Sequence, residues 1–145
     1  MNFKYKEKLS NNANYIKLTD GKSVSGILVG DPHEFYKAFK EGDEPKFRFK
    51  VNMVIQENGM YTAKILEMGA SVYKALADLQ DEGWDLDKTI VSISRKGTML
   101  QTEYSVVPKP VTLSQEQLDK IKGVRLHDLL QKSEKQEETG SNLPF

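Results

Sequence analysis

Three cations alternate with apolar residues about a third of the way along this 145-residue chain. Lys46, Arg48 and Lys50 fall on one side of a two-residue period, and Phe47 and Phe49 begin the other side. This period predicts a β-strand with one apolar and one basic face. Its cations would repeat about every 6.6–7 Å, close to the phosphate spacing of an extended nucleic-acid strand. The alternatives are a solvated basic face, or an inverted arrangement in which the two phenylalanines stack on bases.

Further cations and aromatic rings could extend such a site, because base–aromatic stacking contributes about 1–3 kcal/mol per base whatever the sequence. Lys64 joins the basic row only if the strand register is simple. Arg95 and Lys96 lie at a strand–turn junction, where turn solvation is the alternative. Phe35 and Phe39 also fit one face of a short helix packed on the domain. The candidate phosphate contacts are Lys46, Arg48, Lys50, Lys64, Arg95 and Lys96, and the candidate stacking rings are Tyr36, Tyr104, Tyr61, Phe35 and Phe39.

Short strands must position these residues. The sequence predicts strand runs near residues 14, 23, 46, 60, 88 and 101. Asp20-Gly21 predicts a hairpin between the first two runs. Glycines in the second run predict a bend or a close backbone approach. Asp31-Pro32 is expected to open a long connection that ends near Pro45.

One helix is clearly predicted between the fourth and fifth runs. Val72, Leu76 and Leu79 repeat at helical spacing. Gly83 stands where a left-handed residue ends a helix, and Trp84 follows it. This order predicts a Schellman motif with Trp84 packed back on Leu79, so the tryptophan is interpreted as structural.

The chain after the last strand has two different parts. Ser114 and Gln117 form a capping box that starts an amphipathic helical segment. From Gln131 to Asn142 there is no apolar residue, yet the sequence closes on Leu143-Pro144-Phe145. A hydrophobic tip on a polar, net-acidic tether is typical of a recognition peptide, and a random hydrophobic end is the alternative. We therefore expect a domain over 1–110, a helical extension over 111–130 and a flexible tail over 131–145.

Composition excludes several classes of function. The 21 basic and 21 acidic residues cancel, so a polyanion site must be a local patch. The absence of cysteine removes disulfides, thiolate catalysis and cysteine-ligated zinc. The two histidines form no zinc-protease motif, and no phosphate-cradling or nucleophile motif occurs. We expect a non-catalytic protein with no metal or cofactor. No apolar run approaches the roughly 20 residues of a membrane span, and the N-terminus lacks a signal-peptide core, so a cytosolic location is expected.

A helix inserted between the third and fourth strands of a small, glycine-bent antiparallel barrel is the oligonucleotide-binding (OB) fold pattern. The expected fold class is therefore mainly β, an OB-fold-like barrel with one helix between strands and a C-terminal helical extension. Six strand runs exceed the five strands of that fold. Either the first two runs are one bent strand, or one of them is an accessory hairpin.

The chain also resembles phage-encoded single-stranded-DNA-binding proteins, in residues 25–36, in Arg95–Thr98 with Thr102–Tyr104, and in Leu126–Leu129. The tip Leu143-Pro144-Phe145 is similar to the tail end of bacterial single-stranded-DNA-binding proteins. This tail is thinly acidic, and the cysteine metal knuckle of some phage relatives is missing.

The resemblance implies sequence-independent binding of single-stranded DNA during phage replication, recombination and repair, in the cytoplasm of an infected bacterium. The tail would recruit replication or repair proteins, and a homo-oligomer is compatible with this role. A small-barrel adaptor that binds only proteins is the alternative.

Overall fold

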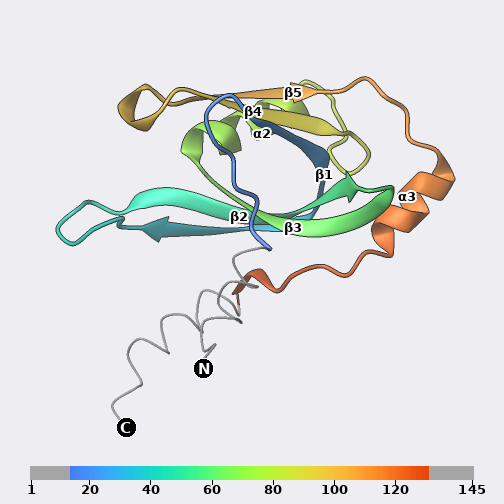
Figure 1. The fold of residues 1–145 in the computed structure, drawn as a ribbon, viewed down its shortest axis with the longest axis horizontal. Helices are drawn as coiled ribbons and strands as arrows, with labels where there is room; N and C mark the ends of the chain where they lie inside the picture. Colours follow the sequence, from blue (N-terminus) through green and yellow to red (C-terminus); the bar gives the residue numbers. More distant parts are fainter. Residues whose placement is uncertain (1–13, 131–145) are drawn as a thin grey trace, which may run out of the picture.

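The computed structural model describes residues 14–130, which form a five-stranded antiparallel sheet with two helices (Figure 1). The strand order is β3-β2-β1-β4-β5, and a helix joins β3 to β4. The mainly β class, the inserted helix and the later short helix confirm the predicted fold class. In chain order the elements are β1 (Ser23–Lys37), β2 (Lys46–Glu57), β3 (Met60–Gly69), α2 (Ala70–Asp81), β4 (Val91–Lys96), the 3₁₀ turn η1 (Met99–Gln101), β5 (Glu103–Pro108) and α3 (Gln115–Lys122).

The sheet curls but does not close into a barrel. Within residues 14–130, no hydrogen-bonded ladder joins the outer strands β3 and β5. β1 belongs to both halves of the sheet, because Ser23–Gly26 pair with β4 and the residues from Ile27 onward pair with β2. The two halves therefore face each other, with β4 and β5 above β2 and β3 in Figure 1.

Two glycines allow β1 to serve both halves. A Cβ at Gly26 would lie 2.5 Å from the Val54 carbonyl oxygen, so only glycine fits where β1 passes from β2 to β4. Gly30, with φ 81°, begins a bulge in β1. Three residues of β1 lie between Val29 and His33, whereas only one residue of β2 lies between their partners Asn52 and Lys50. The predicted connection after Asp31-Pro32 and its short helix are therefore wrong. Pro32 lies in the bulge, where no ladder hydrogen bond is needed, and the strand continues.

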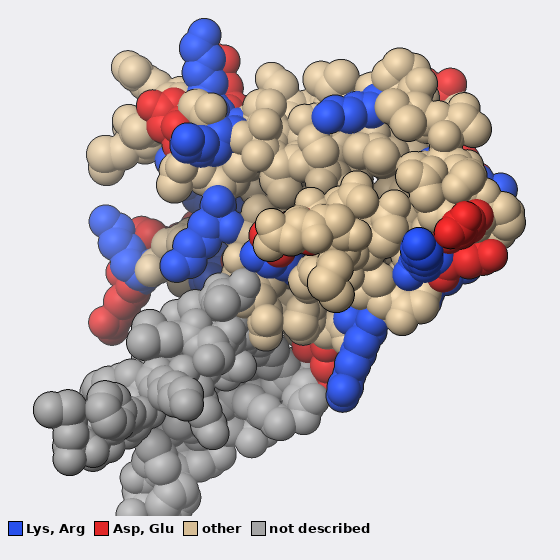
Figure 2. All heavy atoms as spheres, turned by 45° about the vertical axis from the view of Figure 1, so that its right-hand side comes forward, with Lys and Arg blue, Asp and Glu red and all other residues tan. Residues whose placement is uncertain are grey.

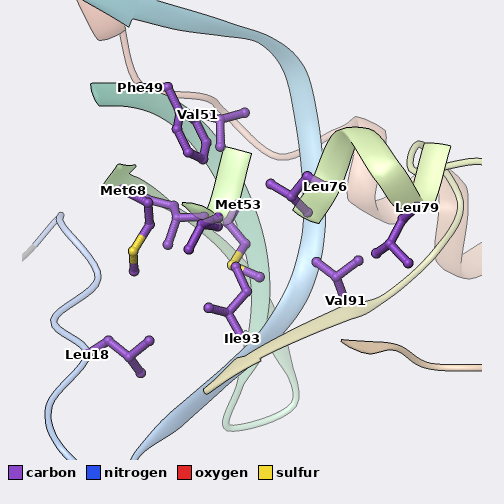
Figure 3. Packing of buried hydrophobic residues seen from close by; sticks show 11 residues of the cluster. Leu18, Phe49, Val51, Met53, Met68, Leu76, Leu79, Val91 and Ile93 are labelled. Atoms are coloured by element: carbon purple, nitrogen blue, oxygen red, sulfur yellow. The ribbon is translucent and has the colours of Figure 1, made fainter. Parts of the chain in front are cut away.

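The core lies between the two halves of the sheet and α2 (Figure 3). The strand predicted to have one basic and one apolar face is β2. Its apolar face forms one side of the core, because Phe49, Val51 and Met53 are buried. Ile93 of β4 packs against the same cluster, together with Leu76 of α2. The burial of these residues confirms the prediction, made from the alternation in the sequence, that the apolar face of β2 points into the core.

Helix α2 ends as the sequence predicts. Val72, Leu76 and Leu79 are its buried residues. Gly83 has φ 104°, and its N–H donates to the Gln80 carbonyl oxygen at 3.1 Å. The Trp84 N–H donates to the Leu79 carbonyl oxygen, also at 3.1 Å, which completes a Schellman motif. The half-buried tryptophan packs on the core cluster that contains Leu79.

The predicted first strand and its hairpin are wrong. Residues near Tyr15 form an isolated parallel bridge to Ile65 at the free edge of β3. The Ile16 N–H donates to the Ile65 carbonyl oxygen at 2.9 Å. The turn at Asp20-Gly21 lies against β4, where the Gly21 N–H donates to the Arg95 carbonyl oxygen. Asp20-Gly21 therefore forms a turn as predicted, but the segment before it pairs with β3 instead of with the strand that follows the turn.

Helix α3 begins at the predicted capping box. The Gln117 N–H donates to the Ser114 hydroxyl, and the Ser114 N–H donates to the Gln117 side chain. Ile121 on its buried face packs in a second cluster with Ile27 and Val54. The chain then leaves the helix and lies along the sheet. None of the helices within residues 14–130 has the length and hydrophobicity to cross a membrane.

Candidate nucleic-acid interface

The strand register determines which candidate residues share a face. Cross-strand partners lie on the same face of a sheet. Lys37, Phe35 and His33 of β1 stand opposite Lys46, Arg48 and Lys50 of β2, and Lys50 stands opposite Glu67 of β3. We call these seven side chains the outer face, because they point away from the core cluster. The predicted basic row therefore does lie on one face, with aromatic rings in the next row.

Lys50 is not open to solvent as predicted. Its side chain is only 4% exposed. The ammonium lies 5.4 Å from the ring centre of Phe35 and 5.7 Å from that of Tyr15. Tyr15 reaches this position because its backbone pairs with the edge of β3. A buried cation close to two rings holds those rings in place. Lys50 therefore positions Phe35 and Tyr15 and is not itself exposed for contact with a ligand.

Arg48 and Lys37 form the more accessible part of the outer face. Both approach one carboxylate, at 3.4 Å from Arg48 and 3.5 Å from Lys37 to Glu67 Oε2. Both also lie over the ring of Phe39, at 5.3 and 5.4 Å from its centre. Phe39 is 57% exposed, so it is accessible to a ligand. The Arg48 Nε is buried and has no hydrogen-bond partner.

Tyr15 adds a neutral ring to this face. Burial raises the pKa of its phenol, and the negative charge of Glu67 raises it further, while Lys37 opposes the shift. A phenol whose pKa lies above its ordinary value is uncharged at neutral pH. Tyr15 therefore adds no negative charge beside a phosphate.

Apart from Lys46, which belongs to the outer face, the other candidate cations are dispersed. Lys46 is exposed where β2 begins, and Lys96 is exposed at the end of β4. Lys64 stands opposite Met53, so it lies on the core-facing side of the sheet, and it pairs with Glu57 at 3.7 Å. The prediction that Lys64 joins the basic row is therefore wrong.

Arg95 of β4 has a structural contact. Its Nη1 donates to the Leu18 carbonyl oxygen at 2.9 Å, and its backbone N–H donates to the Lys22 carbonyl oxygen at 3.0 Å. The side chain thus ties the segment before β1 to β4. Its Nε is buried without a hydrogen-bond partner.

The predicted stacking rings lie in three places. Phe35 and Phe39 belong with the outer face. Tyr36 stands opposite Phe47, on the other face of the same hairpin, and is 72% exposed. Tyr104 is partly exposed on β5, opposite Arg95. Tyr61 is partly buried in the second cluster beside α3, which leaves it far from the rest.

Two strand connections project from the same end of the molecule, at the left of Figure 1. We call residues 38–45 the β1–β2 tip and residues 97–102 the β4–β5 tip. Figure 2 shows Lys and Arg side chains beside Asp and Glu side chains on the left of the molecule, so neither sign of charge dominates there. An OB-fold binds oligonucleotides on the face of its second and third strands and with the loops that correspond to these two tips.

Sequence reasoning missed two exposed residues of the β4–β5 tip. Met99 and Leu100 are among the most exposed apolar side chains that the structure describes. The signal was present, since a turn is expected to be polar and this one contains two large apolar residues in a row.

The C-terminal segment covers part of the same sheet. Asn52, the next outward residue of β2 after Lys50, is 4% exposed and hydrogen-bonds to the backbone of His127. The His127 ring also lies 2.8 Å from the Ala63 carbonyl oxygen. The open part of the outer face is therefore its half next to the β1–β2 tip.

Within residues 14–130, no group of three or more histidine or acidic side chains is placed to hold a metal ion. The predicted tail residues Leu143, Pro144 and Phe145 lie outside the described residues. No protein-family profile matches the chain, nor does any curated protein or solved structure.

Proposed function

We propose that the protein binds single-stranded DNA without sequence preference, across the open half of the outer face next to the β1–β2 tip. One observation carries the proposal: Lys37, Arg48 and Lys50 pack on the rings of Phe39 and Phe35. This combination of aromatic rings and cations is what single-strand binding sites use for stacking and phosphate neutralisation. It lies on the face that binds oligonucleotides in OB-folds.

The solvent exposure of each side chain indicates which residues would contact bases and which would contact phosphates. A base stacks on Phe39, because this residue is 57% exposed and two cations lie close to its ring. Lys46 and Lys37 contact the phosphates on either side, since both are exposed at the root of the β1–β2 tip. Stacking and phosphate contacts do not distinguish bases, and this is the physical reason for sequence independence.

The electrostatic contribution is modest. Glu67 already pairs with Lys37 and Arg48, and Lys50 is buried. If Lys37 and Lys46 gain a phosphate each, the log–log slope of affinity against salt is about −1.4, at about −0.7 per phosphate of a single strand. Stacking must then supply much of the affinity.

The biological setting follows from the resemblance to phage single-stranded-DNA-binding proteins. The protein would protect exposed strands during replication, recombination and repair, without catalysing a reaction. Leu143-Pro144-Phe145 would recruit replication or repair proteins.

A fluorescence-polarisation titration tests the proposal with labelled oligo(dT), oligo(dA) and oligo(dC) of equal length. We expect saturable binding to all three oligonucleotides, weakening as salt rises. Absence of binding at low salt would contradict the proposal. The protein-interaction adaptor would then be favoured, for which Val107 on the outermost strand β5 and Val111 just after it offer exposed apolar surface.

A further inference from the structure

The β4–β5 tip presents two apolar side chains fully to solvent. Met99 is 88% exposed and Leu100 is 103% exposed. All six residues of the tip, from Gly97 to Thr102, are uncharged. The nearest cation in the sequence is the exposed Lys96 directly before the tip, so the tip's own side chains offer apolar contacts with bases rather than contacts with phosphates.

The tip is also held in one conformation. Gly97 has φ 91°, and a Cβ on it would lie 2.3 Å from the Gln101 carbonyl oxygen. The Gly97 N–H donates to the Asp20 side chain at 2.7 Å, which ties the turn to a separate segment. The Gln101 N–H donates to the Thr98 carbonyl oxygen at 3.1 Å. The backbone of the tip is therefore tied to another segment at its first residue and closed by a turn within itself.

Met99 is in the left-handed region, with φ 53°. That region is unfavourable for a residue with a long side chain, and such conformations persist where the surrounding structure imposes them. Here the strained backbone points two apolar side chains away from the protein. A flexible polar loop would connect β4 and β5 without this strain, so the arrangement favours a rigid contact surface.

We propose that the β4–β5 tip is a wedge that unstacks the terminal base pair where a duplex meets the bound single strand. Leucine and methionine side chains are among those that proteins insert between base steps, partially unstacking them. A rigid tip loses little conformational freedom when it inserts. The β1–β2 tip lies at the same end of the molecule (Figure 1), where it would hold the adjacent single strand. This inference rests on the proposed single-strand binding.

The test uses the full-length protein and a duplex with an oligo(dT) overhang, in which 2-aminopurine replaces the terminal duplex base. Unstacking raises the fluorescence of this base. We expect wild-type protein to raise it, and the double variant Met99→Ser/Leu100→Ser to raise it far less. A control, Val107→Ser/Val111→Ser, also replaces two exposed apolar residues with serine, at positions outside the tip that are 54% and 53% exposed, and should behave as the wild type.

A parallel polarisation titration with free oligo(dT) separates the wedge from single-strand binding. We expect the affinity of the tip variant to stay within about twofold of wild type, as for surface substitutions that leave the binding face intact. If wild-type protein binds oligo(dT) but leaves the 2-aminopurine signal unchanged, or if the tip variant opens the junction as well as wild type does, the wedge is wrong. Absence of oligo(dT) binding would overturn the proposed function, and the wedge with it.

Discussion

The side-chain amide of Asn52 forms two hydrogen bonds with the backbone of His127, one as donor and one as acceptor, as a residue of a neighbouring strand would. Asn52 Nδ2 donates to the His127 carbonyl oxygen at 3.0 Å, and the His127 N–H donates to Asn52 Oδ1 at 2.8 Å. Because Asn52 is buried in β2, these bonds fasten the C-terminal segment across the sheet. They set the boundary between the covered and the open half of the outer face.

Replacing Asn52 with alanine should destabilise the protein by about 1–3 kcal/mol, because the buried polar groups of the His127 backbone lose their partners. Urea unfolding of the variant measures this loss. Gln56→Ala, an exposed position further along β2, should change stability by less than about 0.5 kcal/mol. Equal unfolding midpoints for the two variants would mean that the C-terminal segment is not held by this pair.

Lys50→Glu should unfold more readily than wild type by roughly 2–4 kcal/mol, because it places the opposite charge in a buried position between two rings. Lys50→Met keeps the aliphatic packing and should cost only about 1 kcal/mol, the scale of a cation–π contact. Thermal or urea unfolding distinguishes the two. A fully stable Lys50→Glu variant would show that this side chain is open to solvent.

Phe39→Ala should weaken oligo(dT) binding by about 1–3 kcal/mol, or roughly 5- to 150-fold, if one base stacks on this ring. Tyr36→Ala removes a more exposed ring from the opposite face of the same hairpin and should change affinity by about twofold or less. Polarisation titrations at one salt concentration compare them. A larger effect at Tyr36 would place the strand on the other face.

Gly26→Ala should destabilise the fold by about 1–3 kcal/mol, because its Cβ would meet the Val54 carbonyl oxygen. Gly123→Ala is the matched control, since its nearest atoms lie at an ordinary 3.6 Å and its φ is −81°. Circular-dichroism melting curves measure both. If Gly26→Ala melts as the control does, β1 does not require glycine at its bend.

Local patterns predicted much of the fold. The alternation of β2 identified its buried face, and the order Leu79, Gly83, Trp84 predicted how α2 ends. These features depend on residues that are close in sequence. The continuation of β1 through Pro32 was missed, because a proline within a strand is compatible with pairing only when a bulge such as the one at Gly30 removes its ladder position.

The candidate site was less predictable because it depends on register and on distant segments. Lys64 is separated from the basic row by its pairing with Met53, which no local pattern specifies. Lys50 is buried because Tyr15 arrives from a segment that pairs with β3, and because Phe35 lies on the continued β1. The sequence therefore predicted which residues lie on the outer face better than it predicted which of them are exposed to solvent.

Backbone amide chemical shifts recorded during a titration with unlabelled oligo(dT) test the central claim most directly. The account predicts the largest shift changes at Lys37, Phe39 and Lys46, with little change at Lys74 on the exposed side of α2. The absence of shift changes, or changes confined to α2 and the edge of β5, would contradict it.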